Sequence, residues 1–339
     1  MKTNFLRLTF GSLLGAGLAL SVLAAPQQAA REDKAAQAKK WAARLKDGDP
    51  DVRAESARAL GRLGAKEYAK EIAPLLKDGT VAVKTKAAWA LAELGAKEYA
   101  NDIAALLRNN DEDVRGWAAL ALGQLGAKEH AREIAPLLKD EGVHARLDAA
   151  VALGRLGAKE YAKEIAPLLK DELVLQAGGG LVAVALGRLG AKEYVKEIAP
   201  LLGKNGDAAM GGGVALGLSL LEAREYAPEI APLLKSADAY ARGCAAWALG
   251  HLGAKEHAKE IAGLLKDAEA AARGPAAWAL GKLEAKECAQ SLAGMIDDSS
   301  KCDLFGEATK EMVETTVGAV ATQVLKDWGM DPENLKQPK

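Results

Sequence analysis

The four histidines are the first residues that could do chemistry, because a neutral imidazole is a common metal ligand. His130 and His257 occupy one position of a repeating pattern in which most copies carry tyrosine, so each is interpreted as a substitute for a half-buried aromatic ring. His251 and His257 flank one predicted turn, but no cysteine or acidic residue stands beside them at ligand spacing. We therefore expect no metal site and no bound cofactor.

The cysteines and the paired acids do not indicate an enzyme. Cys244, Cys288 and Cys302 are too few for a disulfide framework, and at most one pair could form. No Ser/His/Asp set and no activated cysteine stands out. Acid pairs such as Glu67 and Glu71 recur through the chain and are better explained as solvated helix charges. We expect a protein without catalytic residues.

Composition narrows the class of partner. The chain has 339 residues, of which 50% are apolar and only 4% aromatic. The 45 basic and 46 acidic residues nearly cancel, so no electrostatic footprint for nucleic acid is present. Abundant alanine, leucine and glycine favour closely packed helices over a sandwich of bulky strands.

The N-terminus predicts export. Lys2 and Arg7 provide a positive start, residues 8–20 an apolar stretch, and residues 22–24 small side chains at the cleavage positions. The alternative is an uncleaved membrane anchor, but the apolar stretch is short and contains several glycines. We expect residues 1–24 to be a cleaved signal peptide and the protein to be periplasmic or extracellular.

A short linker, residues 25–33, follows the signal, and no membrane span is expected after cleavage. The nearest candidate, residues 208–221, is too short to cross a bilayer.

An internal repeat organises most of the chain. The string Gly-Ala-Lys-Glu, or a close variant, recurs at steps of 31, 31, 31, 33, 32, 31 and 31 residues. Its copies begin at Gly64, Gly95, Gly126, Gly157, Gly190, Glu222, Gly253 and Glu284. A fixed period in the thirties is typical of a solenoid, in which each unit stacks on its neighbours.

Each repeat predicts two helices. Residues 66–77 carry one apolar stripe, and Pro74 inside them should kink that first helix. Residues 82–94 predict the second helix, which Gly95 should end.

The ends of the array are expected to be atypical. Residues 35–47 and 51–63 form an initial pair. A closing helix over 307–328 lies in a capping region, residues 299–328, before a flexible tail, residues 329–339.

The pattern DVRAESARALGRLG at residues 51–64, joined to a proline-bearing first helix, resembles the HEAT-like repeats named for phycobilisome lyases. The resemblance covers residues 34–298. It implies an all-α, right-handed α-solenoid of about nine antiparallel helix pairs, with the second helices on the concave side. One HEAT-like enzyme, deoxyhypusine hydroxylase, holds iron with His-Glu pairs, and this chain contains no such pair. Because fold does not determine function, the lyase association remains one of name.

The same resemblance implies a ladder of basic residues between repeats. That column reads Arg53, Lys84, Arg115, Arg146, Gly179, Ala209, Arg242 and Arg273. The fifth and sixth repeats have no basic residue in this column, and the period is also longer there. Two glycine runs fall in the same place: Gly178, Gly179, Gly180 and Gly211, Gly212, Gly213. The runs lack the flanking residues of a phosphate loop. We interpret this region as a hinge, because glycine weakens helices.

The remaining candidate is a column of apolar residues at position six of the second helices, counted from the residue that matches Val52. It reads Arg58, Trp89, Leu120, Val151, Val184, Val214, Trp247 and Trp278, with Trp117 on the same side. Position nine is nearly always glycine, which predicts close approach of a neighbouring helix. The column either packs between second helices or forms an apolar groove with tryptophan anchors for a partner.

We therefore expect an exported scaffold that binds a protein or peptide through its concave second-helix surface. A lyase- or hydroxylase-related protein with a bound cofactor and a structural envelope spacer are the two alternatives.

Overall fold

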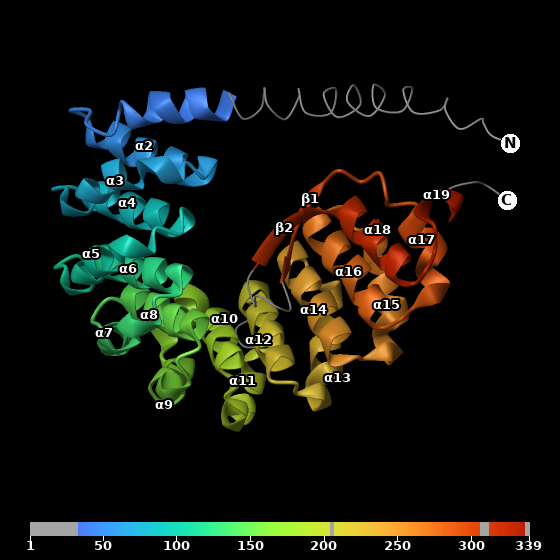
Figure 1. Cartoon of the computed structure of the whole chain (residues 1–339). Coiled ribbons are helices and arrows are strands. Elements are labelled where there is room, and N and C mark those ends of the chain that lie inside the picture. The colour runs from blue at the N-terminus through green and yellow to red at the C-terminus, as the bar shows by residue number, and fades with distance from the viewer. Residues whose placement is uncertain (1–32, 204–206, 306–311, 336–339) are drawn as a thin grey trace, which may run out of the picture. The chain divides into compact units, whose positions relative to one another are not determined.

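The computed structural model describes residues 33–203, 207–305 and 312–335, and most of them are helical (Figure 1). The predicted signal peptide, residues 1–24, lies outside the described residues, as does the linker apart from its last residue. The chain divides into two compact units, the first ending at Asp102 and the second starting at Ile103. Helix pairs follow one another in tandem, nine of them within the described residues, so the prediction of an all-α repeat fold is confirmed.

The first pair begins with one α-helix over residues 33–42, whereas the first helix of every later pair is a series of short segments. In the first unit, the 3-10 segment η1 (Lys66–Tyr68) leads into α3 (Ala69–Ile72) and then into the 3-10 segment η2 (Ala73–Lys77). Pro74 lies at the start of η2, where its missing N–H and its ring disfavour continuation of the α-helix. The expected kink is therefore a change to a tighter helix.

The same order recurs along the chain. The short α-helical segments are α5 (Ala100–Ala104), α7 (Ala131–Ile134), α9 (Ala162–Ile165), α11 (Val195–Ile198), α13 (Ala227–Ile230), α15 (Ala258–Gly263) and α17 (Ala289–Ala293). The 3-10 segments that flank them are η3 (Lys97–Tyr99), η4 (Ala105–Arg108), η5 (Lys128–His130), η6 (Ala135–Lys139), η7 (Lys159–Tyr161), η8 (Ala166–Lys170), η9 (Lys192–Tyr194), η10 (Ala199–Leu201), η12 (Arg224–Tyr226), η13 (Ala231–Lys235), η14 (Lys255–His257), η15 (Leu264–Lys266) and η16 (Lys286–Cys288).

The second helices are long and mostly buried. They are α2 (Pro50–Leu63) and α4 (Val81–Glu93) in the first unit, and α6 (Glu112–Leu125), α8 (Val143–Leu156), α10 (Glu172–Leu189), α12 (Ala208–Leu220), α14 (Ala239–Leu252) and α16 (Ala270–Lys282) in the second. Most are followed by a left-handed glycine such as Gly157, with φ 67°, as the glycine of the repeat predicts. Glu222 and Glu284 adopt the same left-handed conformation where glycine is replaced.

Consecutive second helices lie close together at the recurrent glycine of position nine. A Cβ added to Gly154 would lie 2.8 Å from the Cα of Ala185 in the next second helix. A Cβ added to Gly250 would lie 2.7 Å from the Cα of Ala279. The predicted close approach is confirmed: these glycines let the backbones of neighbouring helices meet.

The C-terminal end differs from its prediction. Strands β1 (Lys301–Phe305) and β2 (Met312–Thr316) form an antiparallel hairpin, and α18 begins only at Val317 and ends at Asp327. The prediction of one helix over 307–328 is therefore wrong for residues 312–316, which form β2, and is confirmed for residues 317–327. The β-branched residues of β2 favour a strand, and the hydroxyl of Thr316 then caps α18 by accepting from the N–H of Ala319.

The predicted flexible tail is partly ordered. A short helix, α19 (Pro332–Leu335), follows α18, and Gln290 of α17 donates a hydrogen bond to the carbonyl of Leu335 at 3.0 Å. The part of the tail up to Leu335 is therefore bound to the last repeat.

One described helix, α10, is long and apolar enough to cross a bilayer, judged by length and composition alone. This segment was not identified from the sequence. Of its apolar window, 61% is buried inside the protein. A helix at the core of a repeat stack is apolar all round for that reason alone.

Candidate partner-binding surface

The position-six column is half-buried over much of its length. In the first unit this holds for Arg58 and Trp89. In the second unit it holds for Leu120, Val151 and Trp278, and Trp117 is half-buried beside them. These side chains pack against neighbours on one side and reach solvent on the other.

The middle of the column is buried, as the packing alternative expects for it. Val184 is 7% exposed and Trp247 is 2% exposed. Both belong to one apolar cluster with Leu216 and Cys244, against which Trp278 and Leu220 pack. Neither Val184 nor Trp247 is therefore an exposed anchor on the second-helix side.

The sixth repeat was aligned two residues out of register. The carboxylate of Asp207 accepts from the N–H of Met210, just as Asp111 accepts from Val114 and Asp238 from Ala241. Met210 therefore corresponds to Val52, and the position-six residue of this repeat is Leu216. Val214 faces the core instead and is fully buried.

The C-terminal tryptophans form a stack. The Trp247 ring lies parallel to the rings of both His251 and Trp278, with centroids 4.8 Å and 4.9 Å away. The ammonium of Lys282 lies 5.5 Å from the centroid of the Trp278 ring, within reach of a cation–π interaction. Trp247 therefore stabilises the contact between α14 and α16, and only Trp278 of this pair is accessible.

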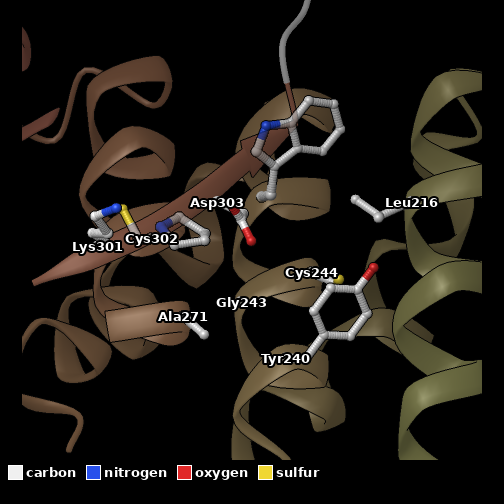
Figure 2. A pocket seen from close by; sticks show the side chains of 10 residues that line it. Leu216, Tyr240, Gly243, Cys244, Ala271, Lys301, Cys302 and Asp303 are labelled. Atoms are coloured by element: carbon white, nitrogen blue, oxygen red, sulfur yellow. The ribbon is translucent and has the colours of Figure 1, made fainter. Parts of the chain in front are cut away.

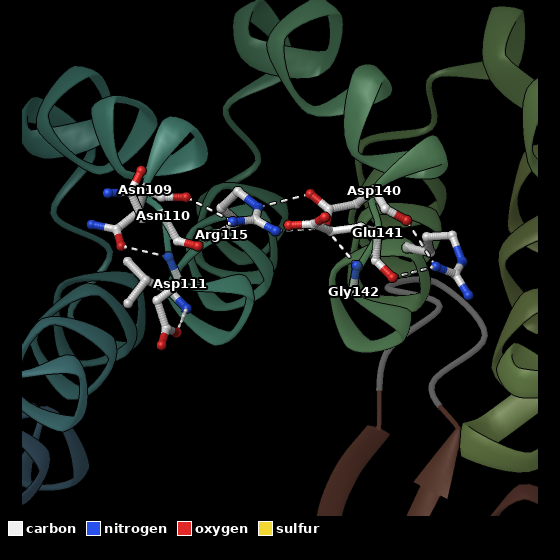
Figure 3. Close-up of polar contacts among 9 residues, drawn as sticks. Asn109, Asn110, Asp111, Arg115, Asp140, Glu141 and Gly142 are labelled. Atoms are coloured by element: carbon white, nitrogen blue, oxygen red, sulfur yellow. Dashed lines mark hydrogen bonds and ion pairs between the residues drawn. The ribbon is translucent and has the colours of Figure 1, made fainter.

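The basic ladder joins consecutive repeats through paired hydrogen bonds. Arg115 donates from Nε and Nη2 to the two carboxylate oxygens of Asp140, at 2.7 Å and 2.6 Å. Its Nη1 donates to the carbonyls of Asn109 and Asn110, which lie just before α6 (Figure 3). Arg53 with Asp78 and Arg242 with Asp267 pair in the same way. Arg146 with Asp171 and Arg273 with Asp298 form ion pairs at 3.0 Å and 2.8 Å.

The ladder lowers the pKa of its carboxylates. Burial alone would raise the pKa of Asp140, but hydrogen bonds from Arg115 and from the N–H of Gly142 outweigh it and hold that pKa below its usual value. At Asp78 and Asp267 the hydrogen bond from the arginine is the largest cause of a lowered pKa. Lys84, the lysine of this column, has no ion pair within the described residues.

The glycine-rich middle of the chain is a close contact between two helices. Gly178, with φ 154°, interrupts the helical geometry of α10. A Cβ added to Gly180 would lie 2.7 Å from the carbonyl of Met210 and 3.0 Å from the Cα of Gly213. The glycines thus allow α10 and α12 to touch backbone to backbone. The hinge at Gly178–Gly180 and Gly211–Gly213 stays a prediction, which hydrogen exchange over 176–189 and 207–219 would test.

The two histidines at the tyrosine position of the repeat each contact a glutamate three residues later. His130 is 5% exposed, and its Nδ1 lies 2.8 Å from Oε1 of Glu133. The Nδ1 of His257 lies 3.3 Å from Oε2 of Glu260 in the equivalent place. Among the described residues no cluster of three or more potential metal ligands occurs.

A small apolar pocket was not predicted from the sequence. It has a volume of about 110 Å³ and lies between the second helices and β1 (Figure 2). Its lining is Leu216, Tyr240, Gly243, Cys244, Trp247, Ala271, Pro275, Lys301, Cys302 and Asp303. Burial raises the pKa of Cys244 to about 12 and that of Cys302 to about 11, so both thiols stay protonated at neutral pH.

Three exposed apolar side chains were also missed. Leu173 and Leu181 of α10 are 61% and 45% exposed, and Tyr240 of α14 is 43% exposed. Leu181 stands at position three, the position of Trp117 in its own repeat, so extending the column to that position would have found it.

The comparisons with known proteins agree with this repeat architecture. A family model described as HEAT repeats matches residues 38–123, 101–177 and 227–308. No curated protein matches the chain.

Three solved structures are similar. The complex of CpcE and CpcF of phycocyanin lyase from Nostoc is 23% identical, with a TM-score of 0.45, covering 72% of this chain and 87% of that chain. YibA of Escherichia coli is 17% identical, with a TM-score of 0.46, covering 73% and 92%. Human deoxyhypusine hydroxylase in complex with glycerol is 18% identical, with a TM-score of 0.34, covering 80% and 99%.

Proposed function

Because the chain belongs to the HEAT-repeat proteins, we propose that it is an exported, non-catalytic scaffold that binds a partner protein. The observation that carries this proposal is the half-buried apolar side of its second helices. Leu120, Val151 and Trp278 are only half-buried there, although a solvated helix face is normally polar. A half-buried tryptophan beside aliphatic residues resembles the anchors that dominate protein interfaces.

The corrected column limits where a partner can bind. Val184, Val214 and Trp247 are buried and support the stack. The available anchors are Trp89 in the first unit and, in the second, Trp117, Leu120, Val151 and Trp278. The two sets lie in different units, so each is tested by itself.

Single alanine substitutions test the proposal. Wild type and the variants Trp89→Ala, Leu120→Ala and Trp278→Ala are immobilised and exposed to a native envelope extract. Each variant should retain less of a specific envelope protein than wild type does. Leu122→Ala serves as the stability control, because Leu122 is fully buried and truncating a buried leucine costs roughly 2–5 kcal/mol. The proposal fails if retention by each variant only follows its loss of thermal stability.

Export is part of the proposal and has its own test. The apolar run of residues 8–20 and the small residues 22–24 favour cleavage after Ala24. N-terminal sequencing of protein from the periplasm or medium should begin at Ala25. A chain that keeps Met1 and stays with the membrane or cytoplasm would contradict export.

A further inference from the structure

The pocket beside the C-terminal hairpin has the size and lining for one apolar side chain. Leu216 of α12, Tyr240 and Trp247 of α14, and Pro275 of α16 surround it, and Figure 2 shows Leu216, Tyr240 and Asp303 around the same space. An apolar cavity of about 150 Å³ in another protein takes up benzene. A pocket of about 110 Å³ therefore fits a side chain the size of leucine or methionine.

The thiols in the pocket do not indicate metal or redox chemistry. Cys244 is 6% exposed and Cys302 is 4% exposed. A thiol must lose its proton to bind a metal or act as a nucleophile, and burial disfavours that loss at both residues. The pocket is therefore suited to an apolar group.

The strand beside the pocket has an unpaired edge. Ser300 accepts a backbone hydrogen bond from Val317, and Lys301 lies opposite Thr316 in the β1–β2 register. Because hydrogen-bonded and non-hydrogen-bonded pairs alternate in an antiparallel ladder, Cys302 bonds to β2 while Lys301 and Asp303 do not. The backbone N–H and C=O groups of Lys301 and Asp303 thus point away from β2, and no described residue bonds them.

The pocket and this edge lie together. Lys301, Cys302 and Asp303 all line the pocket, and both Lys301 and Asp303 are exposed. A strand that paired with this edge would direct alternate side chains to opposite faces. One of them would enter the pocket while its neighbours remained outside.

The charges at the mouth favour a basic ligand. Asp303 and Asp238 both act electrostatically on Tyr240 in the pocket wall. Lys301, the one cation among the described residues that line the pocket, pairs with Glu314 of β2 at 2.9 Å. The arginines that act on Asp238 and Cys302 are Arg242 and Arg273, and they pair with Asp267 and Asp298. The uncompensated charge at the pocket mouth is therefore negative, which complements lysine or arginine in a ligand.

We propose that an extended peptide segment of a partner protein pairs with the free edge of β1 and inserts one aliphatic side chain, flanked by a basic residue, into this pocket. The inference rests on the proposed function, that the repeat stack binds a protein. It adds the chemistry of the bound segment and a site separate from Trp278 and Leu120.

Selection from a displayed library of random heptapeptides tests the proposal on the full mature chain. Asp303→Pro removes the outward N–H of the β1 edge without removing a β1–β2 hydrogen bond. Ala271→Phe fills the pocket from an exposed helix position. The matched control is Met312→Pro, because Met312 lies opposite Phe305 in another non-hydrogen-bonded pair, its N–H faces the other edge of the hairpin, and the Lys301–Glu314 pair stays intact.

We expect wild type and Met312→Pro to select peptides with one aliphatic residue beside lysine or arginine. A selected peptide should bind Asp303→Pro and Ala271→Phe at least tenfold more weakly, and its own Leu→Ala variant roughly tenfold more weakly. Thermal melts of all variants confirm that each is folded, and either of the two site variants suffices if the other does not fold.

The absence of any selected peptide, or equal binding by wild type and both site variants, would overturn the inference. Retention of an envelope protein that depends on Trp278 but not on Asp303 or Ala271 would leave the proposed scaffold function intact. The two failures are therefore distinguishable.

Discussion

Replacing Arg115 by methionine should weaken the junction between two repeats far more than an ordinary surface change. The guanidinium makes four hydrogen bonds: two to Asp140 and one each to the carbonyls of Asn109 and Asn110. Methionine keeps much of the apolar stem but none of these donors. The Asp140 side chain is 8% exposed, and of the bonds described here it would keep only that from the N–H of Gly142.

The expected loss follows from this geometry. Removing one partner of a buried ion pair costs about 3–5 kcal/mol, because the other charge remains buried and unpaired. We expect roughly 3 kcal/mol for Arg115→Met, since some solvent reaches the pair. The control is Arg58→Met, which removes the more solvent-accessible pair with Glu55 and should lower the free energy of unfolding by less than about 1 kcal/mol.

Urea unfolding at pH 7 measures both variants, with hydrogen exchange to locate the loss. Protection should fall in α6 and α8, the helices that the pair joins. Adding Asp140→Leu to Arg115→Met should restore part of the stability, because it removes the unpaired carboxylate. A loss no larger than that of Arg58→Met would refute the structural role given to the ladder.

Acid should weaken the same junction. The pKa of Asp140 is lowered in the folded chain, so its contribution is present above the unfolded value of about 3.9 and is lost as pH falls through the folded value. Arg115→Met should therefore make the free energy of unfolding less dependent on pH below about pH 4.

Three further changes test other parts of the structure. Burial raises the pKa of Asp148 to about 6, so ionising this carboxyl costs more free energy in the folded chain than in the unfolded chain. Asp148→Asn removes that cost and should raise the free energy of unfolding by roughly 2 kcal/mol at pH 7. The gain should vanish near pH 4, where the carboxyl is protonated in the folded chain. Gly154→Ala should destabilise the stack by roughly 1–3 kcal/mol because its Cβ has no room, whereas Gly263→Ala, which meets nothing within 4 Å, should be neutral or slightly stabilising in the same urea titration. A thiol reagent at pH 8 should modify the half-buried Cys288 first and leave Cys244 unmodified until the chain unfolds; equal rates would contradict the described burial.

The repeat itself was predictable because its period carries several independent signals. Gly64 ends one second helix, and Pro74 changes the next first helix from α to 3-10 geometry. Arg53 pairs with Asp78 in the following repeat. Each signal recurs at nearly the same spacing, so one unit predicts the others. The position-nine glycines also indicated close helix contact, which Gly154 shows.

The sixth repeat shows that the register of each helix needs its own anchor. Its step differs from the common 31 residues, and counting placed Val214 at position six. The cap formed by Asp207 places Met210 at the position of Val52, and Met210 also precedes the left-handed Glu222 by the same interval that separates Val52 from Gly64. The spacing from Asp207 to Met210 matches that from Asp111 to Val114 and would have given the correct register.

The pocket was not predictable from one repeat. Its residues come from three second helices and from β1, so no local spacing brings them together. The sequence pattern predicted a closing helix over 307–328 and therefore no hairpin. The run Val313 to Thr316, rich in β-branched residues, was the signal for a strand.

Site-specific photo-crosslinking tests the central proposal, that the second-helix side binds a protein, most directly. A photoreactive residue is placed at Leu120 or Trp278 on that side, and at the exposed Glu71 of a first helix as the control. We expect both second-helix positions, and not position 71, to crosslink the same protein in intact cells. No crosslinked protein, or the same products from all three positions, would contradict a binding surface on the second helices.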